Sequence, residues 1–282
     1  MLFRSKAICF RIGPVVQSSA PSNLSLAIKD FKDGVVGVHI WSTLGWQEIR
    51  LRYRRSLLGP FWLTLSTGAL IAGMGPLYGK LFGQSLATYF PYLAISFITW
   101  TLIASLINEC SNAFIAAEGY IKQIKLPLTL HILRVVWKNV LVFAHNAVII
   151  AVVLIFYPPE VGWHLFQAPL GVLMIAVNGV WLGLLLGLLC ARFRDIPLII
   201  ASVVQVGFFL TPVMWKAGTL GSLGWAAQIN PLFHFLEIVR TPLLGSSASL
   251  RSWIAVLLVT VVGYAVTLLV FSRYRARIAY WV

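Results

Sequence analysis

The sequence is dominated by seven long stretches that contain no Asp, Glu, Lys or Arg. A helix needs about 20 predominantly apolar residues to cross the hydrocarbon core of a bilayer, and each stretch reaches that length. The stretches are residues 56–79, 81–108, 139–159, 161–191, 196–215, 217–236 and 252–272. Because only 11% of the 282 residues are charged, against roughly a quarter in soluble domains, the sequence predicts an all-α polytopic membrane protein.

Six of the seven stretches are expected to be transmembrane helices. Residues 217–236 are the exception, because their Gly, Pro, Asn and Gln residues interrupt a helix and require polar partners. With the residues that follow them, they are expected to form a re-entrant segment at the outer membrane surface, between spans five and six. The six predicted spans are residues 59–80, 88–111, 129–156, 168–190, 196–215 and 252–271.

The distribution of basic residues predicts the orientation. If both termini are cytoplasmic, 18 Lys and Arg residues lie on the inner side, and only Lys80, Lys216, Arg240 and Arg251 lie outside. Inner loops of membrane proteins carry such an excess. We therefore expect a multi-pass protein of the bacterial inner membrane with both termini in the cytoplasm. The basic residues form no separate domain, so no nucleic-acid partner is expected.

The segment before the first span is expected to form an amphipathic helix along the inner membrane surface. Trp46, Ile49 and Tyr53 fall on one helical face. Arg50 and Arg54 lie beside them and would face lipid headgroups or water. A second apolar column on the same helix does not suit a single lipid surface, so packing against another helix of the protein is the alternative.

The sequence contains no motif for nucleotide binding, catalysis or metal binding. Its Gly-Lys pair, Gly79–Lys80, is followed by Leu81 and not by the Ser or Thr of a phosphate-binding loop. ATP and Mg are therefore expected to bind to a partner subunit, with no cofactor in this chain. The eight acidic residues, five histidines and three widely spaced cysteines form no catalytic or metal-ligand pattern, so no metal site is expected.

Polar side chains within the predicted spans must find hydrogen-bond partners. They include Asn139, His145, Asn146, Asn178 and Gln205. Hydrogen bonds between helices are the simpler interpretation, and a substrate or proton site is the alternative. Asn108 and Glu109, near the inner end of the second span, either face an aqueous pore entrance or form an ion pair at the membrane interface.

Aromatic residues make up 13% of the chain. Most such residues form interfacial belts or fill the core of a membrane protein. The functional alternative is a path for a sugar chain, because the apolar face of a sugar ring stacks on an aromatic side chain and weak repeated contacts permit sliding. The candidates for pore or glycan contact are Phe61, Trp62, Tyr89, Phe90, Trp100, Asn108, Phe208, Phe209 and Trp215.

Four segments, in the same order along the chain, resemble a known family. They are RYRRSLLGPFWLTLS at 52–66, the segment that starts FPYLAISFITW and ends YIKQIKLPLTL at 90–130, ARFRDIPLIIASVVQVGFFLTPVMW at 191–215, and NPLFHFLEIVRTPLLG at 230–245. Over about residues 38–271 the chain resembles the type-two ABC transporter permeases that export O-antigen and capsular or teichoic-acid polysaccharides.

This resemblance implies a homodimer of permeases bound to two ATP-binding subunits, with a pore at the dimer interface and membrane lipids around it. The implied substrate is a lipid-linked polysaccharide that moves from the cytoplasm to the periplasm. ATP hydrolysis would take place in the separate subunits, so this chain is expected to be a permease and not an enzyme.

The resemblance also implies two sets of functional residues. The inner loop after the second span would contact the ATP-binding subunit, although a basic loop that binds lipid headgroups is the simpler interpretation. The residues of this coupling loop are Glu118, Gly119, Tyr120, Ile121, Lys122, Ile124, Lys125 and Pro127. The outer segment would close the pore as a gate, with residues Asn230, Pro231, Glu237 and Arg240.

Three regions are expected along the chain. Residues 1–37 form a cytoplasmic arm without clear periodicity that is expected to be partly disordered. Residues 38–271 form the transmembrane domain, and residues 272–282 form a basic cytoplasmic tail. Two other functions remain open at this point. They are export of a small molecule or drug by the same architecture, and a membrane-embedded glycosyl or acyl transferase that uses His131 or His145.

Overall fold

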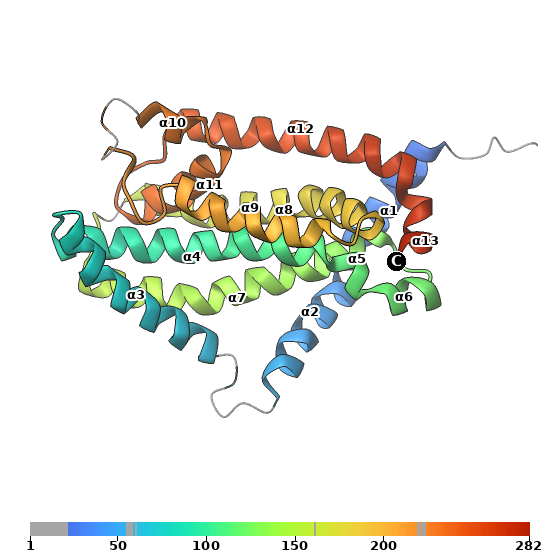
Figure 1. The fold of residues 1–282 in the computed structure, drawn as a ribbon, viewed down its shortest axis with the longest axis horizontal. Helices are drawn as coiled ribbons and strands as arrows, with labels where there is room; N and C mark the ends of the chain where they lie inside the picture. Colours follow the sequence, from blue (N-terminus) through green and yellow to red (C-terminus); the bar gives the residue numbers. More distant parts are fainter. Residues whose placement is uncertain (1–21, 55–58, 60, 161, 219–220, 222–223) are drawn as a thin grey trace, which may run out of the picture.

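The long helices of the protein run side by side along its longest axis (Figure 1). The structure is a computed structural model and describes residues 22–54, 59, 61–160, 162–218, 221 and 224–282. These residues form helices, turns and short connections, and no strand is found among them. The prediction of an all-α fold is confirmed for this part of the chain.

Four helices in the described ranges are long and apolar enough to cross a membrane. They are α4 (Leu86–Ser111), α7 (Leu128–Phe156), α8 (Gln167–Arg192, preceded by the 3-10 helix η1, Trp163–Phe166) and α12 (Leu250–Tyr274). Each coincides with a predicted span to within a few residues. Uninterrupted apolar runs favour this outcome, because a helix satisfies its own backbone hydrogen bonds when no water is present.

The other two predicted spans correspond to α3 (Phe61–Leu81) and α9 (Ile196–Leu210), which are not among these four. Four glycines and a proline dilute the apolar character of α3. Helix α9 ends five residues before residue 215, the predicted end of the fifth span. Pro212 disfavours helical backbone at the preceding residue, and Thr211 is accordingly extended, with φ −95° and ψ 137°.

Helix α4 lies at the centre of the bundle, in contact with α3, α7, α8, α9 and α11. It is the most buried of the four long apolar helices. The close approach of α8 depends on Gly183, where a Cβ atom would lie 2.9 Å from the Cys110 Sγ atom of α4. Because small residues let helix backbones approach each other in a membrane bundle, this contact fixes α8 against α4.

The two ends of the bundle carry different elements (Figure 1). One end, called here the α6 end, holds α1 (Asn23–Val36), α5 (Ala113–Ala116), α6 (Glu118–Gln123) and α13 (Ile278–Trp281). The opposite end, called the α10 end, holds α10 (Gly224–Ile229), which is followed in the chain by α11 (Pro231–Leu243). Helix α2 (Val38–Tyr53) packs against α7, and the 3-10 helix η3 (Arg275–Arg277) joins α12 to α13.

The sequence analysis assigns no helix to residues 1–37, whereas residues 23–36 form α1. The face that α1 buries consists of Ala27, Asp30 and Gly34, which are small or polar. Apolar residues do recur at helical spacing over residues 24–35, a sign of this helix that the prediction missed. Residues 1–21, which make up most of the predicted arm, lie outside the described part of the chain.

The segment between α9 and α12, which was predicted to be re-entrant, reaches into the helix bundle. Its second half, α11, packs against α4, α8 and α12. At Gly171 of α8 a Cβ atom would lie 2.7 Å from the Ile238 carbonyl oxygen of α11, so the two helix backbones are close together. The apolar face of α11, with Phe235, Leu236 and Val239, belongs to the main core.

Candidate functional site

The segment that joins α4 to α7, residues 112–127, lies at the α6 end and is the predicted contact with an ATP-binding subunit (Figure 1). Tyr120 and Ile124 are 48% and 51% exposed, whereas Ile121 packs against the main core. The segment therefore presents two apolar side chains outward while a third anchors it to the bundle.

The other residues of this coupling loop are mostly exposed. Lys122 Nζ lies 2.6 Å from Glu118 Oε1, and this hydrogen bond lowers the pKa of Glu118. The Cα of Gly119 faces open space, Lys125 is exposed, and Pro127 stands at the N-terminal cap of α7. Exposed ion pairs contribute little to stability, so this charge pattern is better suited to contact with a partner than to holding the fold.

Four charged side chains from three helices meet beside the coupling loop. Arg134 Nη1 lies 2.9 Å from Glu48 Oε1, and Lys138 Nζ lies 3.2 Å from Glu48 Oε2. Lys138 Nζ also lies 2.8 Å from Glu109 Oε2, which accepts a further hydrogen bond from Asn139 Nδ2 at 2.7 Å. Two cations and two carboxylates therefore balance, and they join α2 to α4 and α7.

This ion-pair network borders a cavity of 610 Å³ that Asn108, Asn112 and Tyr120 also line. Glu109 forms the predicted ion pair with Lys138, and Glu109 and Asn108 both line this cavity. The sequence analysis does not name Glu48 as a candidate. The spacing of Arg134 and Lys138 could have indicated that a carboxylate partner was needed, because it puts two cations on one face of an otherwise apolar helix.

Three of the predicted glycan-contact residues form one aromatic cluster. The Phe208 ring centroid lies 5.8 Å from that of Trp100 and 5.3 Å from that of Phe209. Trp100 is buried in the contact between α4 and α9, whereas Phe209 is 65% exposed. Phe209 and Trp215 line a groove of 890 Å³ along α9 and α10. Within the single chain, these two aromatic residues have the surface that a ligand contact requires.

The remaining aromatic candidates lie apart from this cluster. Tyr89 is fully buried, and its hydroxyl donates to the Met214 carbonyl at 2.7 Å. Phe90 is half-buried against α3, where its ring lies over Gly75. Phe61 and Trp62 are exposed at the start of α3.

Two of the predicted outer gate residues form an ion pair, in which Arg240 is buried and Glu237 is partly buried, although Arg240 was expected at the outer surface. Arg240 is 4% exposed, and its Nη2 lies 2.6 Å from Glu237 Oε2. Arg240 Nη1 donates to the Tyr92 hydroxyl and the Pro212 carbonyl, both at 2.7 Å, and to Ser96 Oγ at 3.2 Å. Burial of this cation is tolerated because carboxylate, hydroxyl and carbonyl oxygens surround it.

The other two gate residues begin α11. The Asn230 side chain accepts a hydrogen bond from the Leu232 amide at 3.0 Å, which caps the helix, and Pro231 occupies its first turn. Asn230 Nδ2 also donates to Thr211 Oγ1 at 2.8 Å. The start of α11 is thereby joined to the residue that follows α9.

The residues predicted to form one membrane-facing side of α2 differ in burial. Ile49 is buried, whereas Trp46 is 45% exposed. Arg50 and Arg54 are exposed, and the side chain of Tyr53 lies outside the described part. Because α2 packs against α7, the alternative of packing against another helix describes it better.

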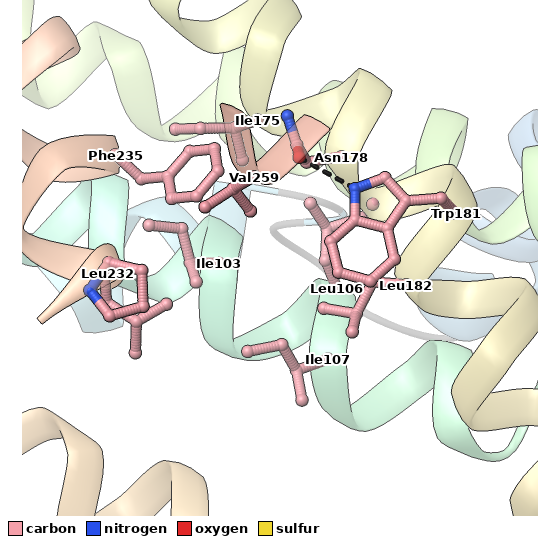
Figure 2. A pocket seen from close by; sticks show the side chains of 12 residues that line it. Ile103, Leu106, Ile107, Ile175, Asn178, Trp181, Leu182, Leu232, Phe235 and Val259 are labelled. Carbon is pink, nitrogen blue, oxygen red and sulfur yellow. Dashed lines mark hydrogen bonds between the residues drawn. The ribbon is translucent and has the colours of Figure 1, made fainter. Parts of the chain in front are cut away.

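Two of the polar residues within the spans bond to neighbouring helices. Trp181 Nε1 donates to Asn178 Oδ1 at 2.8 Å beside an apolar cavity of 170 Å³ (Figure 2), and Asn178 Nδ2 donates to Thr260 Oγ1 of α12 at 2.8 Å. Asn139 bonds to Glu109 of α4, as described above. His145, in contrast, bonds to a carbonyl one turn earlier in its own helix.

The described residues contain no group of three His, Cys, Asp or Glu side chains that is arranged to hold a metal ion. His131 is buried, and neither of its ring nitrogens has a hydrogen-bond partner within that part of the chain. Cys110 and Cys190 are buried free thiols.

Comparison with known proteins decides the family. Residues 40–244, which are most of the chain and run from α2 through α11, match the model of the family described as ABC-2 type transporter. The chain belongs to this family. This ABC-2 protein is also similar to the O-antigen export system permease protein RfbA of Myxococcus xanthus, at 21% identity over 174 residues, which are 62% of this chain and 67% of the relative.

The ABC-2 match confirms the resemblance found in the sequence. The protein is a multi-pass membrane protein and the membrane subunit of a transporter, and it is not itself an enzyme. The alternative of a glycosyl or acyl transferase that uses His131 or His145 is therefore wrong. Permeases of this family work with a partner ATP-binding subunit.

Proposed function

We propose that this ABC-2 permease exports a lipid-linked polysaccharide, of the O-antigen or capsule type, from the cytoplasm to the periplasm. The observation that carries this proposal is the similarity to an O-antigen export permease along 62% of the chain. ATP and Mg are bound by two partner subunits, and two copies of this chain form the pore.

The proposed membrane topology has six spans, in which α3 and α9 join the four long apolar helices. Both pack against α4. At 15 residues α9 is short for a bilayer, and the segment after Leu210 completes its crossing. The α6 end is cytoplasmic in the bacterial inner membrane, because 18 of the 22 Lys and Arg residues then lie inside.

The proposed contact with each ATP-binding subunit is the exposed pair Tyr120 and Ile124. Two apolar side chains that project from a short helix fit a socket on a partner, and such anchors carry most of the binding energy of an interface. Ile121 fixes the same helix to the core, so a movement of the partner is passed to α4 and α7 and not lost in a loose loop.

The proposed glycan path follows the groove that Phe209 and Trp215 line on α9 and α10. A second copy placed against this face encloses the groove between two rows of apolar and aromatic side chains. The cluster of Arg240 with Glu237, and the cap at Asn230, then act as the outer gate, because they hold α11 to the residues after α9.

Deletion of the gene, followed by analysis of cell-surface glycans, tests the proposal. We expect loss of a surface polysaccharide, accumulation of its lipid-linked form inside the cell, and recovery of an ATP-binding protein with the tagged permease from complemented cells. An unchanged surface glycan, together with new sensitivity to a drug, would favour export of a small molecule by the same architecture.

A further inference from the structure

Helix α7 follows the coupling loop directly and begins without a cap of its own. Pro127, at the N-terminal cap position, makes no side-chain hydrogen bond to the helix. The first amide groups of any helix lack partners within the helix. An acceptor from elsewhere in the chain must therefore satisfy them.

Asp30 of α1, 98 residues before Leu128, supplies this acceptor. Its Oδ2 atom accepts from the Leu128 amide at 3.1 Å, and its Oδ1 atom accepts from the Thr129 amide at 3.0 Å. The Thr129 hydroxyl donates to Oδ1 as well, at 2.9 Å. Asp30 is buried, so its charge acts on the positive end of α7 with little screening by water.

Helix α1 makes further contacts with α7 and with α12. At Gly34 a Cβ atom would lie 2.8 Å from the Thr129 Cβ atom, so the two backbones are as close as glycine allows. The Phe31 ring packs edge-on against Tyr264 of α12, with centroids 5.9 Å apart. Arg275, just after α12, donates to the Leu26 carbonyl. Helix α1 thus bridges the start of α7 and the end of α12.

We propose that Asp30 is a positioning residue for energy coupling, and that α1 carries movement of the coupling loop to α12. This inference rests on the proposed function, because it requires the loop to contact an ATP-binding subunit. The physical reason is that an uncapped first turn of α7 frays and absorbs a displacement of the loop. The capped turn, held to α1 by a buried carboxylate, moves with α1 as one body.

The chain offers a matched control. Asp33 is on the same helix but exposed, so Asp33→Asn removes the same charge without touching the cap. Asp30→Asn keeps one acceptor oxygen and loses the other. Thr129→Val removes only the hydrogen bond from the Thr129 hydroxyl.

Amide hydrogen exchange measures how well the cap protects the first turn of α7. It is recorded on the permease bound to its ATP-binding partner in lipid nanodiscs. We expect Asp30→Asn to raise exchange at Leu128 and Thr129 by about fivefold, the effect of one lost capping interaction, and Asp33→Asn to leave it unchanged.

The coupling role is measured by adding a non-hydrolysable ATP analogue to the same complexes. In the wild-type protein and in Asp33→Asn we expect the analogue to change exchange in both residues 118–127 and residues 23–36. In Asp30→Asn the change should be confined to residues 118–127. The amount of surface glycan per copy of membrane-inserted permease should fall about fivefold in Asp30→Asn, the factor that corresponds to the free energy of one lost cap. Hydrolysis of ATP should continue.

Two negative results have different meanings. If α1 responds to the analogue in Asp30→Asn as in the wild-type protein, or if export falls only in proportion to the amount of folded permease, the role of Asp30 is overturned while the proposed function stands. If the wild-type permease binds no ATP-binding protein and its deletion changes no surface glycan, the proposed function itself fails, and the coupling role fails with it.

Discussion

The Arg240 guanidinium lies 2.7 Å from the Pro212 carbonyl oxygen, so a buried cation of α11 holds the residue at which α9 has just ended. Because Pro212 breaks α9, carbonyl groups near this point lose their helical partners. Arg240 Nη1 of α11 and the Tyr92 hydroxyl of α4 both donate to one of these groups, the Pro212 carbonyl. Side chains of two other helices therefore supply hydrogen bonds at the point where α9 ends.

Replacement of Arg240 tests this arrangement. Arg240→Met removes the cation and leaves Glu237 and the Pro212 carbonyl without it, so we expect a loss of about 3 kcal/mol in the free energy of unfolding. Denaturant unfolding of the purified protein in detergent measures this loss. Arg251→Met is the control, because Arg251 is exposed. Equal stability of the two variants would contradict the structural role of Arg240.

The ion-pair network predicts that Glu48 fastens α2 to α7. Glu48→Gln leaves Arg134 and Lys138 with less compensation, and we expect amide exchange throughout α2 to increase, as the loss of about 1–3 kcal/mol would cause. Glu118→Gln, which alters an exposed ion pair, should have no such effect on α2. Glu48→Gln combined with Arg134→Met restores the charge balance and should recover part of the protection. Unchanged exchange in Glu48→Gln would show that apolar packing alone holds α2.

The exposed pair on the coupling loop predicts a separation of binding from stability. Tyr120→Ala with Ile124→Ala removes two anchors of about 1–2 kcal/mol each, so recovery of the ATP-binding protein with the tagged permease should fall at least about tenfold. The unfolding transition should stay in place, since both side chains are largely exposed. Gln123→Ala, at an exposed neighbouring position, is the matched control. Full recovery of the partner with the double variant would exclude this pair as the contact.

Two aromatic residues of one cluster are predicted to behave differently. Trp100 is buried, and Trp100→Ala should lower the free energy of unfolding by about 3–5 kcal/mol because it opens a cavity. Phe209 is exposed, so Phe209→Ala should change stability by only about 0.5 kcal/mol and should lower export if it contacts the glycan. Unfolding in detergent and surface glycan per copy of permease are the two measurements. Normal export by Phe209→Ala would remove it from the glycan path.

The positions of the candidate residues show which features of the site a sequence pattern can predict and which it cannot. Of the apolar residues in the predicted coupling loop, Tyr120 and Ile124 are exposed, whereas Ile121 packs against the main core. Trp46 and Ile49 were placed on one face of α2, but a shared helical face does not say which side meets α7. Arg240 was placed outside because it belongs to the segment expected at the outer surface, and only the oxygen atoms around it in the folded protein permit its burial.

The sequence by itself determined the long helices α4, α7, α8 and α12. Each apolar run must satisfy its own backbone hydrogen bonds in a bilayer, and this requirement depends on neighbouring residues alone. The tertiary structure decided which polar groups meet, such as Asp30 with Leu128 and Arg134 with Glu48. Those partners are far apart in the chain, and their encounter depends on how the helices pack, which no local pattern of residues specifies.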